Sequence, residues 1–103
     1  MKAVATRKQT GPRNAKSKRP PVRFELAGVT AGTVTLAGTF NGWDVNATPL
    51  KEQFPGHWVV ELPLAPGVYE YLLVVDGAWR MDPQAVETAP NPFGGLNAVR
   101  RLA

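Results

Sequence analysis

The 103-residue chain has no cysteine, a single histidine and a single serine. Without cysteine there is neither a disulfide bond nor a thiolate metal site. This composition fits a reducing compartment, and we expect a cytoplasmic protein. The sequence has no run of eighteen apolar residues, so we expect no membrane span. The basic N-terminus lacks the apolar stretch that would make it a secretory signal.

Acidic residues are missing from residues 1–20, which hold seven of the twelve lysines and arginines. This segment has no aromatic residue and contains the breakers Gly11-Pro12 and Pro20-Pro21. It has too little apolar surface to offset its ordering entropy, so we expect a disordered basic tail over 1–20. Residues 21–103 carry all eight acidic residues and five basic ones, and they predict one folded domain.

The basic tail admits two interpretations. Its positive charges can attract nucleic acid or an acidic partner by neutralising negative charge. Because the tail has no aromatic side chain to stack on bases, such binding would be weak and independent of sequence. The other interpretation is a solubilising terminus or linker.

Side chains for catalysis are scarce. His57 adjoins a strand pattern, and Ser17 lies in the tail, so no serine–histidine–acid arrangement is indicated. Glu61 and Glu70 are expected to point to solvent from neighbouring strands, and a sandwich of this size rarely forms the deep cleft of a glycoside hydrolase. The aspartates near the turns lack the spacing of a calcium loop. We therefore expect a protein that is not an enzyme and has neither a metal nor a cofactor.

Apolar and polar residues alternate in several short segments. In 22–26 the apolar residues share one face, and the pattern recurs in 33–36, 58–62, 68–75 and 78–81, with a last strand near Val99. Asp76-Gly77 predicts a tight hairpin between two of these segments. No segment has a sustained helical period. About six or seven short strands separated by turn residues predict an all-β fold, a β-sandwich.

Two of the three tryptophans adjoin turn sequences. Trp43 ends Phe40-Asn41-Gly42-Trp43, and Trp79 follows Asp76-Gly77, whereas Trp58 falls on the inward face of a strand and is expected in the core. A tryptophan at a turn exit can present its ring to solvent. Two such rings on one surface would stack on flat, partly apolar ligands such as sugars. The alternative is that both are half-buried residues that cap the sandwich.

Five sequence segments occur in an order that resembles a known family. They are Ala37–Trp43, Pro49-Leu50, Gly56–Trp58, Pro66–Tyr71 and Val75–Pro83. This order resembles the glycogen-binding module of the AMP-activated protein kinase β subunit and, more broadly, the family 48 carbohydrate-binding modules that precede the catalytic barrel in isoamylases and branching enzymes. The resemblance covers roughly residues 22–102. It implies an immunoglobulin-like (early set) β-sandwich that binds α-1,4-glucans without cleaving them.

The resemblance also implies particular site residues. Trp43 and Trp79 match the two tryptophans that stack on glucose rings, and Asn97 matches an asparagine that hydrogen-bonds sugar hydroxyls. Phe93 takes the place of an apolar residue in the last loop. Leu72 stands where the family has a lysine, which leaves the affinity and the choice of glucan open.

We therefore expect a non-catalytic module that binds glycogen, starch or maltooligosaccharides and directs a partner enzyme or kinase subunit to glucan in trans. The rival hypothesis is an interaction protein that uses the same fold as a scaffold and the basic tail as an anchor for nucleic acid or an acidic partner. Exposure of Trp43 and Trp79 on one surface would favour the first hypothesis.

Overall fold

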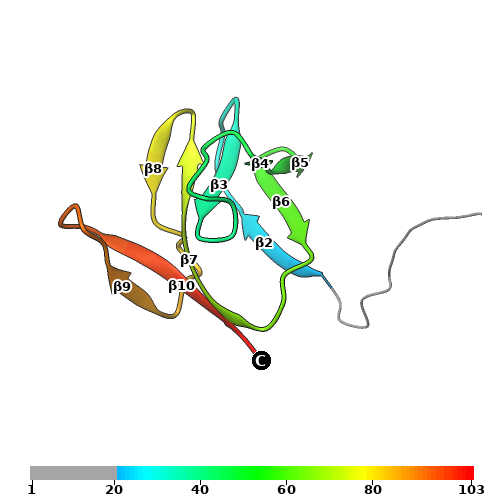
Figure 1. Ribbon diagram of the computed structural model, residues 1–103. Helices are drawn as coiled ribbons and strands as arrows, with labels where there is room; N and C mark the ends of the chain where they lie inside the picture. Colours follow the sequence, from blue (N-terminus) through cyan, green and yellow to red (C-terminus); the bar gives the residue numbers. More distant parts are fainter. Residues whose placement is uncertain (1–20) are drawn as a thin grey trace, which may run out of the picture.

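The computed structural model describes residues 21–103, so the expected disordered tail lies outside the described residues. The described part has nine strands: β2 (Val22–Leu26), β3 (Val34–Gly38), β4 (Thr48–Pro49), β5 (Lys51–Phe54), β6 (His57–Leu62), β7 (Gly67–Val75), β8 (Ala78–Arg80), β9 (Thr88–Pro90) and β10 (Leu96–Leu102). They form two antiparallel sheets (Figure 1). The expected all-β sandwich is confirmed. Within residues 21–103 there is no helix that could span a membrane.

Three of the nine strands were not expected from the sequence. β4, β5 and β9 have two, four and three residues. β4 and β9 are too short for an alternating pattern to be recognised, and β5 does not alternate, because all four of its side chains are exposed. These segments are strands because a neighbouring strand supplies their hydrogen-bond partners.

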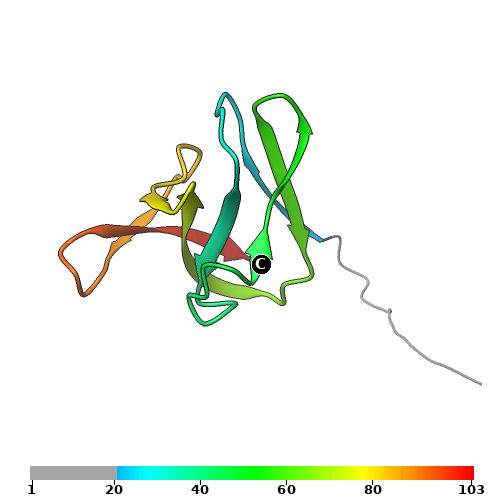
Figure 2. The same ribbon diagram turned by 90° about the horizontal axis from the view of Figure 1, so that it is seen from above.

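The larger sheet is organised around β7. Its strand order is β4-β3-β7-β10-β9, with β8 also paired to β7. β10 pairs with residues 67–71 of β7 and β8 with residues 73–75, while β3 pairs with residues 71–75 along the other edge. Strands β8 and β10 therefore follow one another along one edge of β7, and Figure 2 shows both beside it. This arrangement brings side chains from separate parts of the sequence onto one sheet face.

The hairpin between β7 and β8 has the expected tight turn. Asp76 and Gly77 have φ angles of 49° and 83°. Two successive positive φ angles are typical of the type I′ turn, whose twist matches that of paired strands. The Asp76 carboxylate accepts hydrogen bonds from the backbone N–H groups of Gly32 and Thr33 at 2.8 and 2.9 Å. The turn is therefore anchored to the loop before β3.

The core lies between the larger sheet and a smaller sheet with the order β2-β6-β5. Phe24 of β2 meets Tyr71 of β7 edge-on, with ring centroids 5.0 Å apart. Trp58 is buried as expected, and its indole N–H donates to the Val29 carbonyl at 3.1 Å. The remaining buried residues of this cluster are Leu26, Val34, Leu36, Leu50, Leu73, Val75 and Ala98.

A buried polar pair ties the segment after β8 to the core. The Tyr71 hydroxyl donates to the Asp82 carboxylate, and both residues are almost fully buried. Burial and the adjacent Asp82 carboxylate raise the pKa of Tyr71 well above its ordinary value. Asp82 also accepts from the Gln84 backbone N–H at 2.9 Å. The chain is thereby fixed two residues beyond the end of β8.

Candidate functional site

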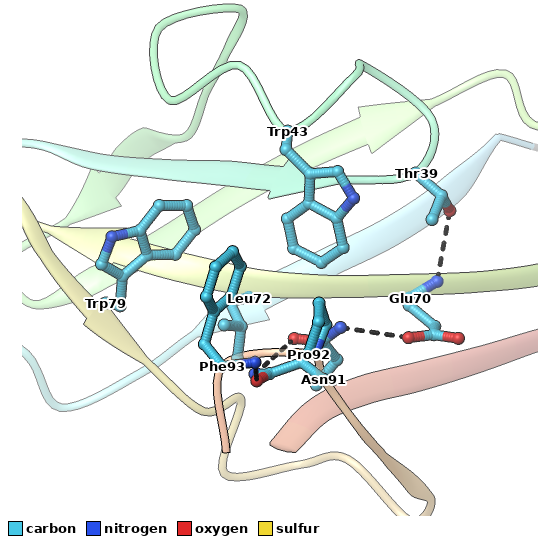
Figure 3. Close-up of a pocket in the computed structure, with 9 residues that line it drawn as sticks. Thr39, Trp43, Glu70, Leu72, Trp79, Asn91, Pro92 and Phe93 are labelled. Carbon is cyan, nitrogen blue, oxygen red and sulfur yellow. Dashed lines mark hydrogen bonds between the residues drawn. The ribbon is translucent and has the colours of Figure 1, made fainter. Parts of the chain in front are cut away.

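The outward face of the larger sheet has a pocket of about 760 Å³. All five residues that the sequence singled out line it, namely Trp43, Trp79, Asn97, Phe93 and Leu72. Figure 3 shows the rings of Trp43, Trp79 and Phe93 around the space above Leu72. Sites for small molecules typically enclose about 300–1,000 Å³, so the pocket has the size of a ligand site.

Trp43 is presented by the loop that follows β3. Its backbone N–H donates to the Gly38 carbonyl at 2.9 Å, and its φ of 62° lies in the left-handed region. The Asn41 side chain holds the same loop: it accepts from the Gly38 N–H and donates to the Leu36 carbonyl and the Thr48 hydroxyl. The half-buried Trp43 ring therefore stands on a loop that is fixed by both backbone and side-chain hydrogen bonds.

This loop begins at a close approach to β7. A Cβ atom on Gly38 would lie 2.6 Å from the Glu70 carbonyl oxygen and 2.8 Å from the Tyr71 Cβ. No residue with a side chain fits there without displacing backbone. Glycine at this position thus allows β3 and β7 to approach closely at the residue where the loop begins.

Trp79 reaches the pocket from the hairpin strand β8. It pairs with Val74, so its side chain lies on the outward face of β7 that also carries Leu72. The Trp79 side chain is 52% exposed. Trp43 and Trp79 line the same pocket, but of the two only Trp79 is exposed. Trp43 is half-buried, as the alternative interpretation of the tryptophans expected.

Phe93 is on the loop between β9 and β10 and is 93% exposed. Asn91 orders this loop, because its side-chain oxygen accepts from the backbone N–H groups of Phe93 and Gly95 at 2.9 and 3.0 Å. The Asn91 backbone N–H donates to the Gly95 carbonyl at 2.9 Å, and Gly94 has a φ of 86°. The exposed ring is therefore held out by a hydrogen-bonded turn.

Asn97 lines the pocket but is only 5% exposed. Its Nδ2 donates to Glu70 Oε1 at 3.0 Å, and its Oδ1 accepts from Asn91 Nδ2 at 3.3 Å. A side-chain amide has two N–H donors and two oxygen lone pairs. One donor and one acceptor of Asn97 remain for a ligand, while the others connect β10 to β7 and to the loop.

Four further residues line the pocket that sequence reasoning did not include: Thr39, Glu70, Asn91 and Pro92. Glu70 lies two residues before Leu72 and therefore on the same face of β7, so strand alternation alone would have identified it. Asn91-Pro92 is a turn-forming dipeptide beside Phe93. For Thr39 we find no comparable signal in the sequence.

The expectation about the two glutamates needs one correction. Glu61 and Glu70 do not lie on neighbouring strands: β6 belongs to the smaller sheet and β7 to the larger one. They diverge because the short segment 63–66 between β6 and β7 crosses from one sheet to the other, which residue alternation within each strand does not reveal. Residues 21–103 contain no group of three or more histidine, aspartate or glutamate side chains arranged to hold a metal ion.

Comparison with known proteins identifies the family. Residues 20–102 match the family described as the glycogen recognition site of AMP-activated protein kinase. The chain belongs to this family. The match spans nearly all of the carbohydrate-binding module, including the loops that carry Trp43 and Phe93 and the strand that carries Trp79. The resemblance found in the sequence is therefore confirmed.

Several curated proteins contain a region similar to this carbohydrate-binding module. The 1,4-alpha-glucan branching enzyme GlgB 2 of Xanthomonas euvesicatoria pv. vesicatoria is 33% identical, over 71% of this chain and 10% of the enzyme. Protein PTST homolog 2, chloroplastic, of Arabidopsis thaliana is 39% identical over 52% of this chain and 10% of that protein. The phosphoglucan phosphatase DSP4, amyloplastic, of Castanea sativa is 31% identical over 63% of this chain and 17% of the phosphatase. The matched region is thus a small part of each relative.

Proposed function

We propose that this module binds α-1,4-glucans, such as glycogen, starch or maltooligosaccharides, and does so without catalysis. The observation that carries the proposal is the pocket in which the rings of Trp43, Trp79 and Phe93 lie around Leu72 and Glu70 of β7. Asn97 of β10 also lines this pocket and is hydrogen-bonded to Glu70. Membership in a glycogen-recognition family supports the same ligand class.

The chemistry of the pocket suits a sugar chain. One face of a glucose ring presents C–H groups and can lie flat on an indole, and ring stacking contributes roughly 1–3 kcal/mol per ring in the comparable case of nucleobases. The hydroxyls at the ring edge need polar partners, which the Glu70 carboxylate and the Asn97 amide offer. The Trp43 and Trp79 rings stand on different segments of the chain, and such an arrangement suits consecutive glucose units of a curved chain better than a single sugar.

The first prediction tests this assignment with tryptophan variants. Trp43→Ala and Trp79→Ala should each weaken maltoheptaose binding at least tenfold in calorimetry, a loss of about 1.4 kcal/mol. Each variant loses one stacking surface. The same variants should lose retardation in a native gel that contains glycogen.

The matched control for these variants is Phe54→Ala. Phe54 is also aromatic and 59% exposed, but it lies on β5 of the smaller sheet, away from the pocket. It should leave maltoheptaose affinity unchanged. All three variants should stay folded, in contrast to Trp58→Ala, which removes a core ring. Unfolding of the Trp43 or Trp79 variant would place that residue in the core and contradict the proposal.

We further propose that the module brings an enzyme to the glucan. The size of the relatives supports this role, because the similar region forms only 10% of a branching enzyme and 17% of a phosphoglucan phosphatase. Co-sedimentation of such an enzyme with glycogen should then increase when this chain is added. The rival function, binding of nucleic acid or an acidic partner through the basic tail, depends on residues outside the described structure. The cytoplasmic location stays a prediction.

A further inference from the structure

The pocket has a single ionisable side chain. Of the nine described residues that line it, only Glu70 can carry a charge. It lies at the end of the pocket opposite Trp79 and below the Trp43 ring (Figure 3). A glutamate side chain is negatively charged at neutral pH. The charge of this carboxylate therefore bears on which sugar chains the pocket accepts.

The hydrogen-bond network fixes Glu70 as its final acceptor. Backbone N–H groups can only donate, so the bonds from Phe93 and Gly95 identify the Asn91 oxygen. Asn91 Nδ2 must then donate to the Asn97 oxygen, and Asn97 Nδ2 must donate to Glu70 Oε1. The side-chain bonds therefore run from Asn91 to Asn97 and from Asn97 to the Glu70 carboxylate. Its other oxygen has no hydrogen-bond partner among the described residues and is left to accept from a ligand.

The arginine that shares the outward face of the sheet with Glu70 is already paired with another carboxylate. Arg101 of β10 lies on the same outward face of the paired strands β7 and β10. Its guanidinium donates to both carboxylate oxygens of Glu87, at 2.6 and 2.7 Å. This ion pair lowers the pKa of Glu87, mainly through the hydrogen bond from Arg101. No described residue that lines the pocket is a lysine or an arginine, so the negative charge of Glu70 is not neutralised there.

We infer that the pocket selects neutral glucans and rejects chains that carry anionic groups, such as phosphate esters or carboxylates, with Glu70 as the residue that determines this specificity. The inference rests on the proposed function and specifies its ligand class. A neutral hydroxyl can donate to the free Glu70 oxygen, with the strength of a charge-assisted hydrogen bond. A phosphate or carboxylate at the same place offers acceptors instead of a donor and repels the like charge.

The experiment compares two oligosaccharides of equal size. One is maltoheptaose with its primary hydroxymethyl groups oxidised to carboxylates, and the other has carboxamides at the same positions. Both are titrated by calorimetry, at low salt, into the full chain and into its Glu70→Gln variant, with maltoheptaose as reference. Glutamine keeps an oxygen that accepts from Asn97, so the variant should unfold at an unchanged temperature. The basic residues 1–20 are present in both proteins, so they affect the affinities of both equally.

The expected result is a change in the ratio of the two affinities. In the Glu70→Gln variant, the affinity for the carboxylate analogue should rise about fivefold relative to the affinity for the carboxamide analogue. This is the size of the repulsion between two unit charges roughly 4 Å apart in water. The gain should shrink as salt rises. An unchanged ratio would overturn the inference, as would a carboxamide analogue that binds the wild-type protein no better than the carboxylate. If maltoheptaose itself does not bind, the proposed function fails and this inference with it.

Discussion

Leu72 is the apolar part of the pocket floor, between the aromatic rings and the polar end of the site. It is half-buried and pairs with Ala37 of β3, and its side chain lies on the outward face of the larger sheet. Glu70 lies two residues earlier on the same face. Any cation placed at position 72 would therefore be close to Glu70, the only charged side chain among the described residues that line the pocket.

We expect Leu72→Lys to strengthen maltoheptaose binding. The ammonium can stay solvated at the open side of the pocket and donate to a sugar hydroxyl, for a gain of roughly fivefold, or about 1 kcal/mol. Val68→Lys is the control: Val68 is 56% exposed on the same face of β7 but does not line the pocket. Calorimetry on both variants checks the prediction. If Leu72→Lys and Val68→Lys bind maltoheptaose with equal affinity, a cation at position 72 makes no contact with the sugar.

At the scale of elements, the conformation of the loop from Gly38 to Trp43 depends on the Asn41 side chain. Asn41 makes three hydrogen bonds that connect the loop to β3 and to Thr48. A tryptophan in the left-handed region costs about 1–2 kcal/mol relative to an ordinary conformation. The bonds made by Asn41 and by the Trp43 backbone N–H compensate for this cost and keep the ring over β7.

Asn41→Ala should therefore affect both stability and binding. It leaves the Gly38 N–H and the Leu36 carbonyl without their side-chain partner, so the free energy of unfolding should fall by about 1–3 kcal/mol. The loop then no longer fixes Trp43, and maltoheptaose affinity should fall with it. Urea denaturation and calorimetry measure the two effects. Asn46→Ala is the control, because only the backbone N–H of Asn46 is hydrogen-bonded. Full retention of affinity in the Asn41 variant would show that the loop is positioned without it.

The strands and turns that could be predicted from the sequence are those whose patterns lie within a few consecutive residues. Alternation along β7 and the Asp76-Gly77 turn act over a few residues, and both were recognised. The bond between Asn97 and Glu70 joins residues 27 positions apart and exists only because β10 pairs with β7. Local patterns do not specify which strands pair. The resemblance to the family therefore identified the aromatic residues and Asn97, whereas the hydrogen bonds that join Asn97 to Glu70 and to Asn91 could not be predicted from the sequence.

At the scale of the whole molecule, charge is distributed unevenly along the chain. Residues 1–20 hold seven basic residues and no acidic one, while residues 21–103 hold five basic and eight acidic residues. Within the described residues 21–103 there are both a complete core cluster and the nine residues that line the pocket. Binding of a neutral glucan and attraction of polyanions should therefore be separable functions of the two segments.

Deletion of residues 1–20 should leave the unfolding temperature and the maltooligosaccharide affinity unchanged, because every core and pocket residue identified within residues 21–103 is kept. The same deletion should abolish salt-sensitive binding to nucleic acid, since the remaining net negative domain repels phosphates. Retention of the full and shortened chains on heparin and amylose resins compares the two functions directly. The shortened chain should pass through heparin and still be retained by amylose. Loss of amylose retention by a folded shortened chain would make the first twenty residues part of the sugar site and contradict the division into a basic segment and a separate glucan-binding sandwich.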